Sequence, residues 1–350
     1  MRALALVGLL LVPGALAAQV KLSGFAEASY SYSGHASGDS IIVGRLYDRV
    51  HDQYMLNALA VVLDKPYDAA KLSAGFHAEL LFGQNASGIQ SNGFKLGDQG
   101  DIPHLYVTLN LPTARGKGNG VQIKVGRIPT LLGLEVIETY ANPNWSEGNQ
   151  FIYVENFTGL GASLEAKLSK SVDAQFRVFN GWDVIRDNNH RKSVMGRVGF
   201  ALDAATSIGI VGFWGPEQAG NDDANRYGAE ALVWHKFGKA AVWAQADYGR
   251  EESARWQGLG AWVTYDLSST VGLALRGDYV DDRDGVRTSG ALGFPANTGH
   301  RFGSATATLN VRTWPDAVIR PELRYDRSTL TAFDGNKGQV TFALAVTYLY

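Results

Sequence analysis

The chain ends in residues 339–350, which read QVTFALAVTYLY. Every second residue from Val340 to Tyr350 is apolar, and the residues between them are small or polar except for Leu349. Successive side chains of a β-strand point to opposite faces, so this segment predicts a strand with one apolar and one polar face. Such strands form transmembrane β-barrels, with lipid outside and water inside. Soluble strands also alternate, so the prediction depends on how often the pattern recurs.

The same period of two residues recurs through the chain. It is clearest in residues 72–82, 105–111, 121–125, 160–168, 172–178, 271–279 and 319–325. Strand starts are expected, among others, near Lys71, Pro103, Val172, Val271 and Gln339. We therefore predict an all-β chain that forms one transmembrane antiparallel up-and-down β-barrel of about sixteen strands, within a range of about 14–18.

The connections between the predicted strands give a second indication. Short connections alternate with long ones, the short ones including 65–70, 169–170, 203–205 and 268–269 and the long ones 34–52, 83–101, 127–156 and 281–301. Outer-membrane barrels have short periplasmic turns and longer external loops. A soluble sandwich or propeller has no reason to alternate in this way.

The first residues predict export from the cytoplasm. Arg2 precedes an apolar run from Ala3 to Val12, and Ala15-Leu16-Ala17 offers a small-residue cleavage pattern. The run is too short to span a bilayer as a helix, so we expect residues 1–17 to be a secretory signal peptide. Residues 18–350 would then form a single barrel domain. An uncleaved membrane anchor is the alternative.

Composition and motifs argue against several function classes. The chain has no cysteine, which excludes thiolate metal sites, and its net charge of −2 argues against a nucleic-acid partner. We find no G-x-S-x-G, H-E-x-x-H or P-loop motif, and the seven histidines show no metal-ligand spacing. We therefore expect no enzyme activity, no cofactor and no metal. A Ser/His pair assembled in space stays open.

Charges on the polar face of the strands are expected to line the lumen, because Arg or Lys facing lipid at the midplane costs about 2–4 kcal/mol. The residues predicted to line a pore are Arg320, Glu322, Arg324, Asp326, Arg276, Asp278, Asp247, Arg197, Asp173, Arg177, Lys124 and Glu79. Their mixed signs predict a wet interior with many ion pairs and no strong preference for one ion sign. A barrel of this width should leave an aqueous lumen. The alternative is that these pairs plug or stiffen the interior.

Two connections carry further candidate residues. The long connection 127–156 contains Glu135 and Glu138, and it either folds into the mouth as a constriction or caps the barrel outward. The acidic residues at 281–284 are followed by Gly285 and suggest a calcium loop. Because the full loop motif with its distal Glu is missing, a solvated acidic turn is the preferred interpretation.

Several fragments in order resemble a known family. They are KLSGF at 21–25, EASY at 27–30, TLLG at 130–133, EVI at 135–137, NPN at 142–144, NGWD at 180–183 and RPELRYD at 320–326. The chain is similar, from about Lys21 to Tyr350, to the putative beta-barrel porin-2 (OmpL-like) family. The resemblance implies a porin-like barrel of the Gram-negative outer membrane without enzyme activity. It implies no particular solute and no established pore residues.

We therefore expect a porin of the bacterial outer membrane that lets small hydrophilic solutes or ions diffuse passively through a water-filled barrel. Its expected partners are outer-membrane lipid, those solutes or ions, and the outer-membrane assembly machinery, with no nucleic acid. The alternatives are a barrel-borne envelope enzyme and a non-conducting structural or adhesive barrel. The transported solute, ion selectivity, gating and oligomeric state, a homotrimer included, stay open.

Overall fold

The computed structural model describes residues 20–36, 40–112 and 120–350. The predicted signal peptide, residues 1–17, lies outside the described residues. The elements, in chain order, are β1 (Lys21–Ser33), β2 (Gln53–Lys65), β3 (Ser73–Phe82), α2 (Gln84–Gly88), β4 (Gly100–Asp101), β5 (Leu105–Leu111), β6 (Val121–Pro129), η1 (Thr139–Ala141), α3 (Asn149–Tyr153), β7 (Thr158–Lys167), β8 (Val172–Phe179), β9 (Ser193–Ala201), β10 (Thr206–Pro216), β11 (Asn225–Phe237), β12 (Ala240–Glu251), β13 (Ala254–Asp266), β14 (Val271–Asp282), η2 (Ala291–Gly293), β15 (His300–Trp314), β16 (Ala317–Ser328) and β17 (Gly338–Leu349). None of the helices in this part of the chain is long and apolar enough to cross a membrane.

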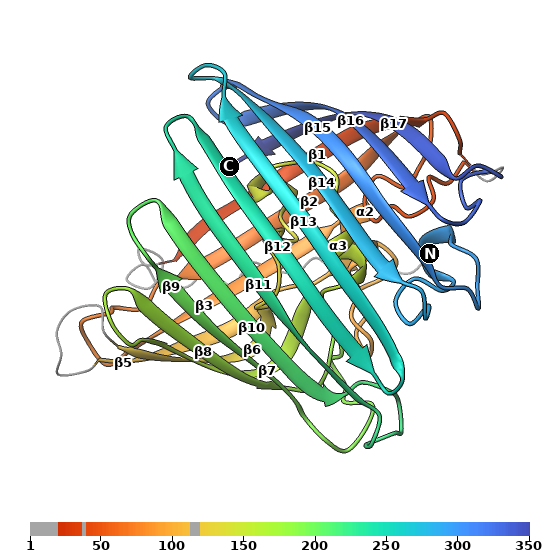
Figure 1. Ribbon diagram of the computed structural model, residues 1–350. Coiled ribbons are helices and arrows are strands. Elements are labelled where there is room, and N and C mark those ends of the chain that lie inside the picture. Colours follow the sequence, from red (N-terminus) through yellow and green to blue (C-terminus); the bar gives the residue numbers. More distant parts are fainter. Residues whose placement is uncertain (1–19, 37–39, 113–119) are drawn as a thin grey trace, which may run out of the picture.

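The strands form one closed antiparallel barrel (Figure 1). Each strand pairs with its neighbours in the sequence, and β1 pairs with both β2 and β17, which closes the ring. The sheet contains 17 strands within the described residues, but the two-residue β4 pairs only with the end of β3. The remaining sixteen form the wall, so the predicted fold class and strand number are confirmed. Closure satisfies the backbone groups of every wall strand without an exposed edge.

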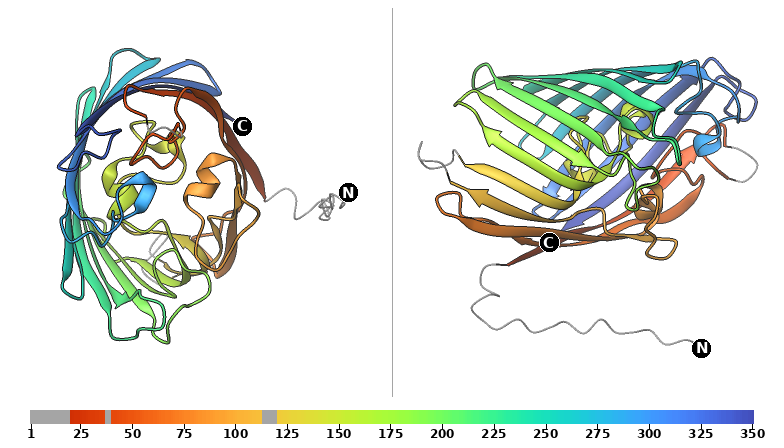
Figure 2. Two further views of the ribbon diagram at one scale, coloured as in Figure 1. Left: turned by 90° about the vertical axis from the view of Figure 1, so that its right-hand side faces the viewer. Right: turned by 90° about the horizontal axis from the view of Figure 1, so that it is seen from below.

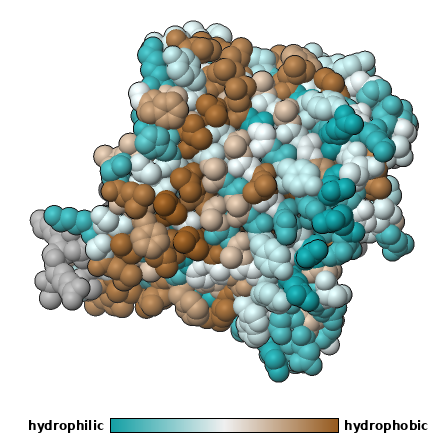
Figure 3. All heavy atoms as spheres, in the orientation of Figure 1, coloured by the Kyte–Doolittle hydropathy of each residue, from teal (hydrophilic) through white to brown (hydrophobic). Residues whose placement is uncertain are grey.

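The wall has an apolar outer face. In β17 the side chain of Phe342 is 45% exposed, whereas Thr347 on the opposite face is 0% exposed. Figure 3 shows apolar residues gathered over the strands and hydrophilic residues over the end that carries the long loops. The alternation predicted from residues 339–350 therefore separates a lipid-facing surface from an inner one.

Connections fold back inside the ring, as the end-on view in Figure 2 shows. One apolar cluster joins Leu132, Ile137 and Phe151 of the connection between β6 and β7 to wall residues that include Phe179 and Phe213. The expectation of an interior that is wet throughout is therefore wrong for this part of the barrel. The connection contains many apolar residues, and burying them inside the barrel removes them from water.

Candidate functional site: a loop folded into the barrel

Residues 130–157, which we call the inserted loop, cross the interior from β6 and β7 to the opposite wall. The carboxylate of Glu135 accepts hydrogen bonds from Arg276 Nη1 at 2.8 Å and from Trp262 Nε1 at 3.1 Å. It also accepts from the backbone N–H of Gly148 at 2.6 Å, which holds two parts of the loop together. Of the two alternatives left open by the sequence, the loop takes the inward one.

A second anchor joins the inserted loop to β14 and β15. Asn149 Nδ2 donates to Asp278 Oδ1 at 2.5 Å, and Asp278 also accepts from Ser304 Oγ at 2.9 Å. Asn144 Nδ2 donates to Thr308 Oγ1 at 2.7 Å. All of these side chains come from the inner face of the wall or from the loop itself, so the contact is polar although it is buried.

Arginines of β16 hold the backbone of the inserted loop. Arg320 donates to the carbonyl oxygens of Thr139 and Tyr140, both at 2.7 Å. Arg324 donates to the carbonyl oxygen of Glu147 at 2.6 Å. Charged donors on carbonyl oxygens form stronger hydrogen bonds than neutral ones, and these satisfy loop carbonyls that lie outside regular structure.

The start of the inserted loop and α3 contact β11 and β12. The backbone N–H of Gly133 donates to Glu230 Oε2 at 2.7 Å, and Gln150 Nε2 donates to Asp247 Oδ2 at 2.5 Å. Gly133 has φ +81°, and a Cβ there would lie 1.9 Å from the carboxylate of Glu155. A positive φ favours glycine at this position, where its backbone N–H reaches Glu230 and its surface lies against Glu155 of the same loop.

The structure places all the residues predicted to line a pore on the inner face of the wall. Most of them are buried, and all but the last of these contact the inserted loop or one another: Arg320, Glu322, Arg324, Asp326, Arg276, Asp278, Asp247 and Arg177. Arg177 instead donates to the carbonyl oxygen of Pro129 in β6. The side chains that keep partial exposure are Lys124, Asp173 and Arg197. Glu79 is buried in contact with His104. The charges on β14 and β16 therefore bind the loop rather than face open water.

Two cavities lie beside the inserted loop, and Leu131 and Gly133 line both of them. One of about 390 Å³ also contacts Arg197 and Trp243 on the wall. The other, of about 300 Å³, is lined by residues that include His104. The sequence analysis did not single out Trp243 or His104. The position of Trp243 on the polar face of its strand was an available signal, whereas His104 lies just before β5 and had none.

The acidic turn 281–284 has internal partners for its buried carboxylate. Asp282 accepts hydrogen bonds from the backbone N–H groups of Val286, Arg287 and Thr288 at 3.1, 3.0 and 2.8 Å. These donors take up the lone pairs that a cation would need. The predicted solvated turn is therefore wrong for Asp282, whose side chain is buried and hydrogen-bonded within the connection.

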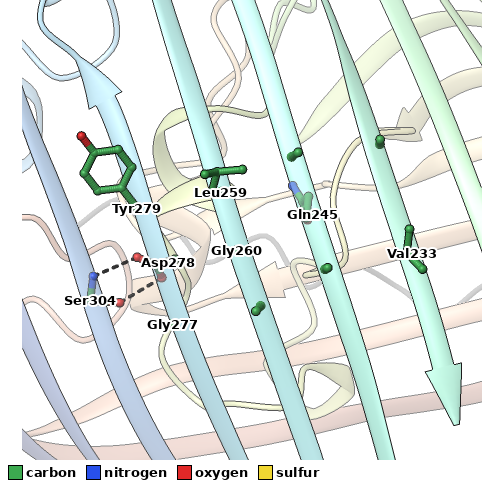
Figure 4. Close-up of a pocket in the computed structure, with 12 residues that line it drawn as sticks. Val233, Gln245, Leu259, Gly260, Gly277, Asp278, Tyr279 and Ser304 are labelled. Carbon is green, nitrogen blue, oxygen red and sulfur yellow. Dashed lines mark hydrogen bonds between the residues drawn. The ribbon is translucent and has the colours of Figure 1, made fainter.

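The outer wall has a shallow hollow of its own. A cavity of about 550 Å³ lies over β11–β14, where the outward residues include Ala246, Ala261 and Gly277 (Figure 4). Asp278 beneath it is hydrogen-bonded to Ser304 on β15. The hollow faces away from the lumen, because its apolar lining belongs to the outer face of the strands.

Two buried glutamates of the inserted loop, Glu155 and Glu147, lie near other carboxylates. Burial raises the pKa of Glu155 well above its ordinary value, and the neighbouring charge of Asp247 adds to the effect. Glu155 Oε1 accepts a hydrogen bond from Gln245 at 2.7 Å, but Oε2 has no hydrogen-bond partner within the described part of the chain. Burial also raises the pKa of Glu147, with the charge of Glu135 as the next cause. Ionising either group therefore destabilises the inserted loop.

We expect Glu155→Gln to raise the free energy of unfolding at neutral pH by at least about 1 kcal/mol, the equivalent of roughly one pKa unit. The native pKa of Glu155 is raised, so its contribution to stability is full below the ordinary value of 4.5 and is lost as the pH rises. The gain should therefore vanish in acid. Urea unfolding in lipid vesicles at several pH values measures it, with Glu252→Gln in an exposed turn as the control. A destabilised Glu155→Gln variant at neutral pH would contradict this account.

Comparisons with known proteins agree with the geometry. The model of the family described as putative beta-barrel porin-2, OmpL-like, matches residues 19–350. The comparison with curated proteins found no match.

Solved structures share the architecture at low sequence identity. OprB of Pseudomonas putida, in a high-pH structure, aligns with a TM-score of 0.65 at 10% identity, over 96% of this chain and 95% of that one. OmpT of Vibrio cholerae, an outer membrane protein with loop L8 deleted, aligns with a TM-score of 0.61 at 11% identity, over 95% and 99%. OpdK of Pseudomonas aeruginosa with vanillate aligns with a TM-score of 0.51 at 10% identity, over 95% and 99%.

At these identities the solved structures show the fold alone. The family match covers nearly the whole chain and includes the inserted loop as well as the wall. Its description agrees with the closed antiparallel ring and the apolar outer face. This chain is therefore a β-barrel of the bacterial outer membrane and belongs to the putative beta-barrel porin-2 (OmpL-like) family.

Proposed function

We propose that this barrel conducts small hydrophilic solutes or ions by passive diffusion. The observation that carries the proposal is an asymmetry of the inner wall. The inserted loop is anchored on β11–β16, whereas several inner side chains of β6–β9 keep partial exposure, among them Lys124, Glu165, Asp173 and Arg197. Solutes pass along the strip that these exposed side chains form.

Charges of both signs line the strip. Lys124 Nζ lies 2.9 Å from Glu165 Oε2, and the two side chains are 24% and 17% exposed. Arg197 pairs with Asp173, and these side chains are 29% and 40% exposed. Paired charges in a wet wall give a field that favours neither ion sign strongly, so selectivity is weak and set locally.

Planar-bilayer recording of the purified protein tests conduction and selectivity together. We expect stable single-channel steps, and a shift of the reversal potential towards cation selectivity in the double variant Lys124→Glu/Arg197→Glu. Lys337→Glu in an exposed external connection is the matched control and should leave the reversal potential unchanged. Absence of steps at high protein load would overturn the proposal. Steps with an unchanged reversal potential in the double variant would remove these residues from the conduction path.

We also propose that the protein is not an enzyme. One Ser/His pair is assembled in space, since His300 Nδ1 lies 2.7 Å from Ser328 Oγ. Both residues are buried, and His300 packs against Phe294 and Phe302 in an apolar cluster. A nucleophile in this position is closed to substrate. Hydrolysis of lipid or ester substrates that is lost in Ser328→Ala would overturn this proposal.

A further inference from the structure

Two histidines and a glutamate meet on the wall opposite the Arg276 anchor. His77 and Glu79 lie two positions apart on the inner face of β3, and His104 directly precedes β5. β3 and β5 are paired, and the backbone N–H of Glu79 donates to the carbonyl oxygen of His104 at 2.8 Å. One nitrogen or carboxylate oxygen from each of the three residues lies within 4.8 Å of the others.

The inserted loop brings a fourth donor to the same place. His104 Nδ1 lies 3.0 Å from Glu79 Oε2 and 3.2 Å from Glu138 Oε1. Glu138 stands just before η1 in the inserted loop. Two imidazoles and two carboxylates therefore converge from three segments of the chain.

Two buried atoms in this cluster have no hydrogen-bond partner among the residues that the structure describes. They are Glu79 Oε1 and His104 Nε2, in side chains that are 1% and 5% exposed. A buried polar atom without a partner costs about 1–3 kcal/mol, so the retention of two of them in one cluster calls for an explanation. The neighbouring cavity of about 300 Å³, lined by His77, His104 and Glu138, leaves room for an ion with bound water.

The ring of His77 is already held in place. Its Nδ1 lies 3.3 Å from Asp64 Oδ1 on β2, and the ring stacks on Tyr106 at a centroid distance of 5.3 Å. A histidine that binds a metal through one nitrogen usually donates its other N–H to a carboxylate, which fixes the tautomer and the ring. Asp64 provides that contact and leaves Nε2 of His77 for a ligand.

We propose that His77, Glu79, His104 and Glu138 bind a divalent transition-metal ion of the Zn²⁺ type. Two nitrogen and two oxygen donors suit tetrahedral Zn²⁺, with bonds of about 2.0–2.2 Å. Cu²⁺ and Ni²⁺ share the preference for imidazole, whereas Ca²⁺ and Mg²⁺ prefer all-oxygen sites and are excluded by the histidines. The bound ion joins the inserted loop to β3 and β5.

Zinc binding is measured on the chelator-treated, detergent-purified full chain by competition with a chromophoric chelator. We expect one Zn²⁺ per chain, an affinity at least about tenfold weaker in His77→Gln, His104→Gln and Glu138→Gln, and no competition from Ca²⁺. His235→Gln is the matched control. The His235 side chain is exposed, and among the described residues it is hydrogen-bonded only to the Thr206 hydroxyl. Heat-modifiable electrophoretic mobility confirms that each variant is folded.

The wild-type protein gives a test that no misfolded variant can obscure. Cobalt(II) added in place of zinc should produce the visible absorption of a tetrahedral site, and one equivalent of Zn²⁺ should abolish it. Absence of this absorption, or a zinc affinity that is equal in wild type and His104→Gln, would overturn the proposal. Metal binding is measured without any conductance recording, so failure of the metal-site proposal and failure of the channel proposal are distinguishable.

Discussion

Replacing residues 134–153 by a short Gly/Ser linker is expected to raise the single-channel conductance several-fold. These residues contain most of the inserted loop, including η1 and α3, and they occupy interior volume that ions would otherwise cross. A barrel of sixteen strands without internal segments leaves a wide aqueous channel. The wall should survive, because its strands pair with one another around a closed ring independently of the loop.

The measurement is planar-bilayer recording of both proteins at the same salt concentration. Shortening the external connection 218–223, between β10 and β11, is the control and should leave the conductance unchanged. The variant without residues 134–153 should also lose its weak ion selectivity, because solutes would no longer be held against the charges of β6–β9. A conductance equal to that of the wild type would show that the inserted loop does not limit the pore.

Arg276→Met is expected to lower the free energy of unfolding by about 3–5 kcal/mol, the usual cost of removing one partner from a buried ion pair. The Arg276 side chain is 0% exposed and lies 2.8 Å from Glu135 and 3.2 Å from Asp278. It also donates to the carbonyl oxygen of Ser146 at 2.5 Å. Methionine removes the counter-charge that Arg276 gives to the buried carboxylates of Glu135 and Asp278, which is costly in a medium of low polarity.

A double-mutant cycle measures the interaction energy between Glu135 and Arg276. Glu135→Gln restores charge balance, so Glu135→Gln/Arg276→Met should be less destabilised than the sum of the two single variants. Urea unfolding in lipid vesicles, followed by tryptophan fluorescence, measures all four proteins. Arg283→Met removes a largely exposed arginine paired with Asp281 and should cost less than about 1 kcal/mol. Additive effects in the cycle would show that Glu135 and Arg276 do not hold the loop together.

Predictions from local periodicity agree closely with the wall of the barrel. The expected starts at Val172 and Val271 coincide with β8 and β14, and the start at Gln339 is one residue beyond that of β17. The starts near Lys71 and Pro103 are each two residues early, at the edges of β3 and β5. Such errors arise because turn and strand residues both tolerate extended backbone, so the first paired residue is set by the neighbouring strand.

The interior was harder to predict, because its contacts join residues that are distant in sequence. Glu135 and Arg276 are 141 positions apart, and nothing in the period of either segment indicates that they meet. The charged residues on the polar faces of the strands are equally compatible with an open lumen and with a loop anchored inside the barrel. His77 and His104 likewise lack local metal-ligand spacing, and the pairing of β3 with β5 brings them together.

The sequence by itself determined the compartment, the strand period and which face of each strand is charged, since these depend on neighbouring residues and on the contrast between lipid and water. Only the tertiary structure decided that residues 130–157 enter the ring, that the arginines of β14 and β16 bind this loop, and that four metal-type ligands converge. Those outcomes depend on closure of the barrel, which fixes the opposite walls at a distance that the loop can bridge.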